Sequence, residues 1–397
     1  MEFDHLKTYK RFLGDALPKS ILDNLDDRMR AVKKGTSAER FPELVDMTRC
    51  VIQDFFDELP DSGQLDLFQT IGDLVYYMEL ATFIGPELCG AKRRRFIELF
   101  RQVDVEGLTQ NPTRIIFGKL SGKHLEPIFA ELRELVKETV TGWDENRSRE
   151  NANFLEVVMR ECTKDGVVDW DAVFWDVYTM VIAGQANTYV TAGWLLFYYE
   201  TKPHIRAKIL AELSAITPFG EPHKMISQFN RMIYTEQSIR EIVRLSMGFI
   251  EFRSTPRDMT FESDAYNFQI PKDSLIVFVP ITLHMRDDLF PEARKFAPER
   301  HKLNKDGGLE STMVRDCKLT VWGCGRHPCP GLRLANLQLP RCADEDDFVV
   351  HDDLSGLHNR EQRKSQDDNK VRRSLSYFPN HGQVPQAQPQ LRSAPLM

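Results

Sequence analysis

The stretch from Trp322 to Ala335 constrains this chain of 397 residues more than any other part of it. It reads W-G-C-G-R-H-P-C-P-G-L-R-L-A and places Cys329 between glycine-bearing turns and the start of an apolar helical run. Gly323 and Gly325 permit backbone angles that a side chain would forbid. A thiolate at Cys329 would face the positive end of the helix and nearby amides, which predicts a lowered pKa. The pattern indicates one sulfur ligand held rigidly against a large flat group.

Other roles for Cys329 have to be weighed. Most single cysteines are buried small hydrophobes. A zinc site could use Cys324, His327 and Cys329, but this cluster has too few neighbours at finger-like spacing. A disulfide between Cys324 and Cys329 would close a tight loop, and the seven cysteines of the chain form no extracellular framework. A catalytic nucleophile would need a paired histidine and an orienting residue.

Against these alternatives, the string resembles the haem-binding signature of the cytochrome P450 family, F-x-x-G-x-[RH]-x-C-x-G-x-x-x-A. Trp322 stands where phenylalanine is usual, and the matching positions are Gly325, His327, Cys329, Gly331 and Ala335. The resemblance implies that the chain binds haem b (iron protoporphyrin IX), with Cys329 as the axial ligand of the iron. It also implies that Trp322, Gly325 and Gly331 belong to the cofactor site and that His327 contacts a propionate.

Three further matches follow the order of the family. Glu241 and Arg244 form an E-x-x-R on the helical stretch from Met232 to Met247, where residues three apart share one face. Phe296-Ala297-Pro298-Glu299-Arg300 resembles the segment whose arginine joins that pair. The resemblance implies a structural triad of Glu241, Arg244 and Arg300, since buried charges are tolerable only when mutually paired. It also implies that Arg253 contacts a haem propionate, with Arg257 as the alternative.

The stretch from Asp169 to Glu200 is expected to be a long core helix. Asp169 is a suitable cap, and no proline interrupts the run before Pro203. Polar residues within it exclude a membrane span. Within this helix, Ala183-Gly184-Gln185-Ala186-Asn187-Thr188 resembles the oxygen-activation motif of the family. The resemblance implies that Gly184 leaves room for dioxygen and that Thr188 helps to deliver protons.

Asn187 departs from the carboxylate that is usual in this motif. An amide cannot take up and release protons as Asp or Glu does near neutral pH, although it can order a water that does. Family members with Asn here include the sterol and bile-acid hydroxylase branch and its isomerase cousins. Hydroxylation is therefore the favoured chemistry, and an isomerase or rearrangement enzyme is the alternative.

The candidate substrate-binding residues are apolar, which indicates an apolar substrate of medium size. They are Val181, Ala183, Phe249, Ile250 and Phe252. For the segment from Phe249 to Phe252, ordinary core packing is an equal alternative. The residues of the cysteine and oxygen motifs resemble those of fungal family members that act in secondary metabolism. This resemblance implies a terpenoid, sterol-like or polyketide-alkaloid substrate.

The expected fold is mainly α with small β-sheets, the cytochrome P450 fold with a shortened N-terminus and an atypical C-terminus. Apolar residues at spacings of three and four predict helices. A hairpin is expected between residues 258–270 and 274–282, with Pro271-Lys272-Asp273 as its turn. The predicted helices cover residues 17–32, 42–58, 65–82, 93–103, 125–141 and 153–163.

The two ends of the chain are expected to be unusual. Residues 1–339 are assigned to a partial haem domain, and the helix after Cys329 is expected to stop at Pro340. Residues 340–397 are polar and charged and are expected to form a disordered tail. The N-terminus contains no signal peptide and no spanning apolar run. The resemblance implies the surface of the endoplasmic reticulum membrane, and the lack of an anchor leaves the cytoplasm as the alternative.

The resemblance therefore implies a haem-thiolate monooxygenase that receives electrons from NADPH through a cytochrome P450 reductase. The net charge of −7, without a basic stripe, argues against nucleic acid as a partner. A truncated family member that does not hold haem is the alternative from another class.

Overall fold

The computed structural model describes residues 31–37, 39–60, 66–106, 125–141, 153–215, 231–246, 251–262, 266–304, 312–323 and 328–342. The longer helices are α4 (Phe41–Glu58), α5 (Leu67–Phe83), α6 (Gly90–Glu106), α8 (Glu126–Val140), α9 (Phe154–Glu161), α10 (Trp170–Thr201), α11 (Pro203–Leu213), α13 (Ile233–Ser246) and α16 (Leu332–Arg341). The shorter ones are α14 (Pro280–His284), α15 (Thr312–Arg315) and the 3-10 turn η3 (Pro298–Arg300). The strands are β1 (Thr163–Lys164), β2 (Val167–Val168), β3 (Glu251–Ser254), β4 (Met259–Glu262), β5 (Asn267–Ile270) and β6 (Leu275–Phe278). The expectation of a mainly helical fold with small sheets is confirmed.

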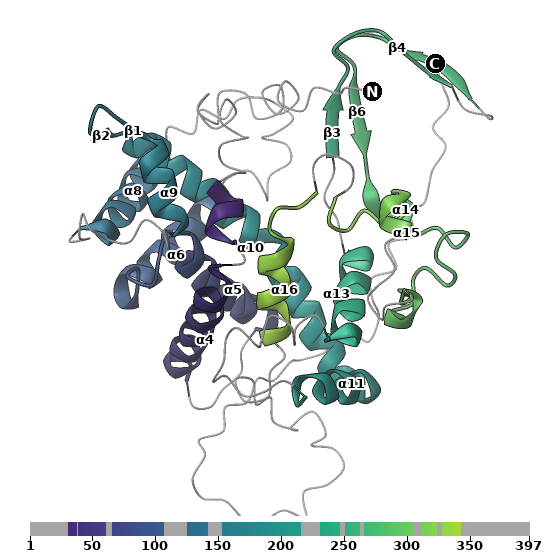
Figure 1. The fold of residues 1–397 in the computed structure, drawn as a ribbon, viewed down its shortest axis with the longest axis horizontal. Helices are drawn as coiled ribbons and strands as arrows, with labels where there is room; N and C mark the ends of the chain where they lie inside the picture. The colour runs from purple at the N-terminus through teal and green to yellow at the C-terminus, as the bar shows by residue number, and fades with distance from the viewer. Residues whose placement is uncertain are drawn as a thin grey trace, which may run out of the picture.

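Helix α10 runs through the centre of the fold (Figure 1). It begins where predicted, because the Asp169 side chain accepts a hydrogen bond of 3.1 Å from the Ala172 amide. Pro203 starts α11 directly after it. Helices α4, α5, α6, α8 and α9 lie to one side of α10, whereas α13, α14 and α15 lie to the other. Helix α16, which follows Cys329, contacts both α10 and α13.

The closest helix partner of α10 is α5, and small residues bring the two together. A Cβ added to Gly193 of α10 would lie 2.6 Å from the Phe68 ring of α5. Apolar side chains of these two helices are almost fully shielded from solvent, including Leu74, Val75 and Leu195. Burial of each such side chain stabilises the fold by roughly 1.5–3 kcal/mol. Glycine is therefore required where the α5 side chains reach the α10 backbone.

The predicted hairpin across Pro271 is wrong in its pairing. Strand β3 pairs with β6, and β4 pairs with β5, so the chain forms one long ribbon that projects from the helices (Figure 1). Pro256 and Pro271 lack the N–H that a ladder needs, and the ribbon is interrupted beside both. Thr255 supports the interruption, because its hydroxyl donates to the Pro271 carbonyl at 2.7 Å.

The helix after Cys329 continues past the predicted stop at Pro340. Helix α16 ends at Arg341 with Pro340 in its last turn, and Cys342 is fully buried. A proline in the last turn removes one helical hydrogen bond, and the helix ends one residue later. The predicted stop of this helix is therefore too early. Within the described ranges, no helix combines the length and apolar character that a membrane crossing needs.

Candidate functional site

The turn that carries Cys329 is held by backbone contacts at the start of α16. The Cys329 amide donates to the Trp322 carbonyl at 2.7 Å, and Gly323 has the positive φ of 74° that its turn requires. A Cβ on Gly331 would lie 3.7 Å from the Cys329 sulfur, in ordinary contact. Cys329 is an exposed free thiol, so the disulfide alternative with Cys324 is not formed.

The predicted lowering of the Cys329 pKa is wrong for the protein alone. Desolvation by the surrounding protein atoms raises the pKa of the thiol, although the side chain has access to solvent. Hydrogen bonds from the Gly331 and Leu332 amides act in the opposite, predicted direction. The helix start does favour the thiolate, but on its own it does not outweigh desolvation.

One turn of α10 presents an open face in the middle of an otherwise packed helix. Ala183, Ala186 and Asn187 are exposed, and their spacing of three and four places them on the same side of α10. Thr188 is buried at the edge of this face. Val181 is fully buried in the core cluster, so the structure separates it from Ala183, with which it was grouped as substrate-binding.

Gly184 contacts a residue that the sequence analysis missed. A Cβ at Gly184 would lie 2.5 Å from the carboxyl carbon of Glu79 on α5. Glu79 stands alone as a carboxylate in the apolar run from Leu74 to Phe83, and that isolation is the sequence signal that could have found it. Gly184, in the segment that resembles the oxygen-activation motif, therefore makes room for a buried acid.

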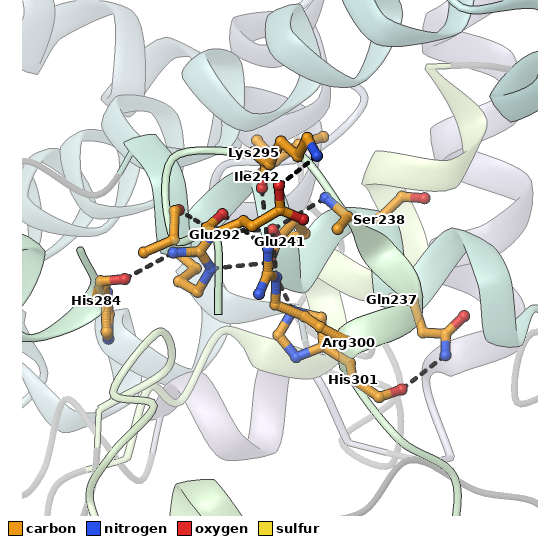
Figure 2. Close-up of polar contacts among 12 residues, drawn as sticks. Gln237, Ser238, Glu241, Ile242, His284, Glu292, Lys295, Arg300 and His301 are labelled. Carbon is orange, nitrogen blue, oxygen red and sulfur yellow. Dashed lines mark hydrogen bonds and ion pairs between the residues drawn. The ribbon is translucent and has the colours of Figure 1, made fainter. Parts of the chain in front are cut away.

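Glu241 is the centre of the predicted triad, and the structure brings its members together (Figure 2). Arg244 donates to both carboxylate oxygens at 2.8 Å, and the Arg300 Nε donates to Oε1 at 2.8 Å. The Ala297 amide donates to the same oxygen at 3.1 Å, and the His301 ring lies 3.1 Å from Oε2. Arg244 and Glu241 are both fully buried, and their opposite charges are in direct contact. This pairing offsets the cost of burying each charge.

The pKa of Glu241 reflects these contacts. Burial alone would raise it, but the hydrogen bonds from Arg244 and His301 and the positive charge of Arg244 lower it to about 2. Phe296, at the start of the F-x-P-x-R segment, stacks on Tyr198 of α10 with ring centroids 3.8 Å apart. The network therefore joins α13, the loop around η3 and the central helix.

A second residue missed by the sequence analysis, His284, links this network to the cysteine turn. Arg244 donates to the His284 carbonyl at 2.7 Å, and the His284 Nε2 accepts from the Thr320 amide at 3.1 Å. Burial and the nearby Arg244 charge lower the pKa of His284 to about 4, so the ring is neutral and Nε2 is free to accept. Gly323 donates back to the Thr320 carbonyl at 3.0 Å. Contacts therefore run continuously from α13 to the turn that carries Cys329.

The remaining predicted residues fall in two groups. Arg253 lies in β3 opposite Ile276 and is partly buried, whereas Arg257 is exposed. Phe252 pairs with Val277 through its backbone, and its side chain lies outside the described part. Five other predicted or alternative site residues lie outside the described ranges: Phe249, Ile250, Cys324, Gly325 and His327.

The donor set suits a group that takes one protein ligand. Among the residues that the structure describes, no three His, Cys, Asp or Glu side chains gather as a metal site. Cys329 offers an accessible sulfur, and Gly331 beside it adds no side chain, where a Cβ would lie 3.7 Å from that sulfur. A haem iron needs one axial protein ligand because the macrocycle supplies four nitrogens, so these residues fit such a group.

Comparisons with known proteins support the same interpretation. The family model described as cytochrome P450 matches residues 43–341. The chain is 22% identical to lanosterol 14-alpha demethylase of Eremothecium gossypii over 79% of this chain and 63% of that protein. It is 22% identical to 24-hydroxycholesterol 7-alpha-hydroxylase of Homo sapiens over 82% of this chain and 69% of that protein. It is 28% identical to ent-kaurenoic acid oxidase 1 of Hordeum vulgare over 85% of this chain and 60% of that protein.

A solved structure shares the fold. Retinoic acid-bound cyanobacterial CYP120A1 superposes with a TM-score of 0.62 at 18% identity, over 80% of this chain and 70% of that one. The chain thus spans between 60% and 69% of the lengths of the three relatives named above.

Proposed function

Because the chain belongs to the cytochrome P450 family, we propose that it is a haem-thiolate monooxygenase that oxidises an apolar small molecule. The observation that carries this proposal is the accessible Cys329 sulfur at the start of α16, next to a central helix with one open turn. Dioxygen is the oxidant, and NADPH supplies electrons through a flavoprotein reductase.

Cys329 would hold the haem iron, with Trp322, Gly325 and Gly331 around the ring and Arg253 and His327 at the propionates. Haem supplies the iron at which dioxygen is reduced, and thiolate ligation favours cleavage of the O–O bond. The network of Glu241, Arg244 and Arg300 would keep α13 and the cysteine turn in place, since its charges are buried and fully paired.

The open turn of α10 would handle oxygen and protons. Gly184 leaves room beside the helix, the Thr188 hydroxyl can donate a hydrogen bond to bound oxygen, and the Asn187 amide can hold a water. The amide itself does not release a proton near neutral pH. This departure from a carboxylate is the observation that favours a second candidate, an isomerase or rearrangement enzyme that needs no delivered protons.

The substrate class rests on the apolar candidates and on the named relatives. Ala183 is exposed on the open face, and Phe249, Ile250 and Phe252 complete the proposed apolar set, whereas Val181 belongs to the core. The relatives are named for lanosterol, 24-hydroxycholesterol and ent-kaurenoic acid, which are sterol or terpenoid compounds. A sterol-like, terpenoid or other secondary metabolite is therefore the proposed substrate, in a fungal setting.

The proposed organisation assigns residues 1–339, with the end of α16, to the haem domain and the following residues to a polar tail. The endoplasmic reticulum surface, where such reductases act, is the proposed location, and the cytoplasm is the alternative.

The test is the spectrum of the purified chain. Reduced protein under carbon monoxide is expected to show the Soret band at the position that gives the family its name. Cys329→Ala should abolish this band, whereas Cys317→Ala, which removes another exposed free thiol, should leave it unchanged. A band typical of histidine-ligated haem, or none, would overturn the proposal and favour a member that does not hold haem in this way. Substrate turnover without NADPH and dioxygen would favour the isomerase.

A further inference from the structure

Glu79 is a buried acid with no task in the proposed function. It lies in the middle of α5, its residue is 1% exposed, and its Oε2 atom has no hydrogen-bond partner among the residues that the structure describes. Buried carboxyl oxygens are normally paired, because leaving one unpaired costs roughly 1–3 kcal/mol. An unpaired acid that is retained in the core of a fold therefore needs an explanation.

The position of Glu79 relative to α10 supplies the first part of that explanation. Its carboxyl group lies against Gly184, where the absence of a side chain gives it room. Gly184 and Thr188 are one helical turn apart and share a side of α10. The carboxyl group is thus adjacent to the turn to which the proposed function assigns oxygen and proton handling.

Gln338 of α16 supplies the second part. It is fully buried, and within the described ranges neither its Nε2 nor its Oε1 has a hydrogen-bond partner. It is close enough to lower the pKa of Glu79, yet the two side chains make no hydrogen bond of acceptable geometry. Together they offer three unpaired polar atoms, which is the number of partners that a buried water typically takes.

We propose that Glu79, as a neutral carboxylic acid, and Gln338 hold one internal water and together form the proton donor for the Gly184–Thr188 turn. This inference rests on the proposed monooxygenase function. It assigns to α5 the acid that Asn187 cannot provide. The O–H proton of Glu79 passes through the water toward the oxygen bound at the turn, and the carboxylate that remains is reprotonated from bulk water.

The electrostatic surroundings agree with this role. Burial raises the pKa of Glu79 to about 8, and the nearby Gln338 amide lowers it by a smaller amount. Titratable groups on the helices that pack around α5 do not contribute to this shift of the Glu79 pKa. They include Asp54 of α4, Glu156 of α9, Asp176 of α10 and Arg333 of α16. Desolvation thus keeps the acid protonated near neutral pH, where a proton donor operates best.

The first test does not depend on haem or activity. Infrared difference spectra of the full chain against Glu79→Gln should show the C=O band of a protonated carboxylic acid at neutral pH, shifted in heavy water. The band should disappear as the pH rises through about 8. Glu134→Gln, which removes an exposed carboxyl on α8, should leave the band in place. A spectrum without this band at neutral pH would show that Glu79 is ionised and would overturn the inference.

The second test measures the fate of dioxygen in the haem-loaded chain with reductase and NADPH. Reduction of dioxygen to two waters takes four protons and four electrons, whereas hydrogen peroxide takes two of each. Glu79→Gln should therefore raise the peroxide released per NADPH and slow water formation on the order of tenfold or more. Glu134→Gln should match the wild type. An unchanged partition in Glu79→Gln would overturn this inference alone, whereas a wild-type chain that lacks the Soret band would overturn the proposed function first.

Discussion

Glu241 on α13 and Glu79 on α5 are shielded from solvent to nearly the same degree, at 0% and 1% exposure, yet their surroundings differ completely. Glu241 meets two arginines, a histidine and a backbone amide. Glu79 meets a glycine and an amide side chain that does not reach it with good geometry. The pKa of the first carboxyl falls to about 2, and that of the second rises to about 8.

The comparison shows that burial alone does not decide whether these two carboxyl groups are ionised. The hydrogen-bond and charge partners of each carboxyl group decide it. Desolvation is the largest influence on both pKa values and raises both of them. Only Glu241 has enough hydrogen bonds and positive charge to reverse it. A fully paired carboxylate suits a fixed structural junction, whereas an unpaired acid can gain and lose a proton.

Removal of the main partner of Glu241 should have the largest effect. Arg244→Met removes the two hydrogen bonds of 2.8 Å that Arg244 donates to the buried Glu241 carboxylate. Because the charge of Glu241 then loses its main partner, the free energy of unfolding should fall by about 3–5 kcal/mol. Urea denaturation followed by circular dichroism measures this loss. Lys208→Met is the matched control, because Lys208 forms an exposed ion pair with Glu299 at 2.6 Å. Its effect should be about 0–1 kcal/mol, and equal losses in the two variants would contradict the distinction.

The pH dependence of stability should separate the two glutamates. The folded pKa of Glu79 is about 8 against an ordinary value of 4.5, so the folded state binds more protons between these values. The contribution of Glu79 is fully present below pH 4.5 and is lost as the pH rises to about 8, at ~1.4 kcal/mol per pH unit. Glu241, with its lowered pKa, contributes above pH 4.5 and loses that contribution as the pH falls to about 2.

The Glu79→Gln variant isolates the first of these slopes. His284 has a folded pKa of about 4 against 6.5, which gives a slope of opposite sign between those values and masks Glu79 in the wild type. The difference between wild type and variant removes that contribution. Glu79→Gln should be more stable by ~3 kcal/mol at neutral pH and equal to the wild type near pH 4. Parallel curves at all pH values would mean that Glu79 does not titrate as described.

Much of the fold follows from local sequence signals. Asp169 and Asn153 cap helices that the periodicity had already placed, and both caps are present. The strand pairing of the ribbon was predicted wrongly because Pro271-Lys272-Asp273 resembles a hairpin turn. In the structure β3 pairs with β6, which lies further along the sequence. Turn composition is local, but strand pairing is not.

The residues of the site also divide into those visible from local sequence and those revealed only by tertiary contacts. The pair of Glu241 and Arg244 is visible in the sequence, since the two residues are three apart on one helix. His284 and His301 were missed because they act through a backbone carbonyl and through side-chain contacts with residues distant in the sequence. Glu79 was visible as a lone acid in an apolar run, but its neighbours Gly184 and Gln338 lie on two other helices. Only tertiary packing reveals an acid without partners.

A methyl group at Gly184 would test how tightly Glu79 is held. Helix propensity alone predicts that Gly184→Ala stabilises α10 by about 0.5–1 kcal/mol, but the new Cβ would meet the Glu79 carboxyl. Overpacking costs about 1–3 kcal/mol, so net destabilisation is expected in thermal or urea unfolding. Gly72→Ala is the control, since its nearest neighbour would lie at an ordinary 3.9 Å, and it should be stabilising. The loss in Gly184→Ala should shrink in a Glu79→Ala background, and an equal loss there would place the clash elsewhere.

The smallest effect should come from the contact that connects the paired network to the cysteine turn. His284→Leu removes the acceptor for the Thr320 amide and should cost about 1 kcal/mol, the net value of one hydrogen bond. If His284 positions the turn, hydrogen exchange of the Thr320 and Cys329 amides should accelerate more than that of amides in α5. Thr320→Val removes only the hydroxyl, which lies 3.3 Å from the ring, and should preserve the slow exchange. Uniform acceleration throughout the protein would instead mean that His284 contributes stability without orienting the residues around Cys329.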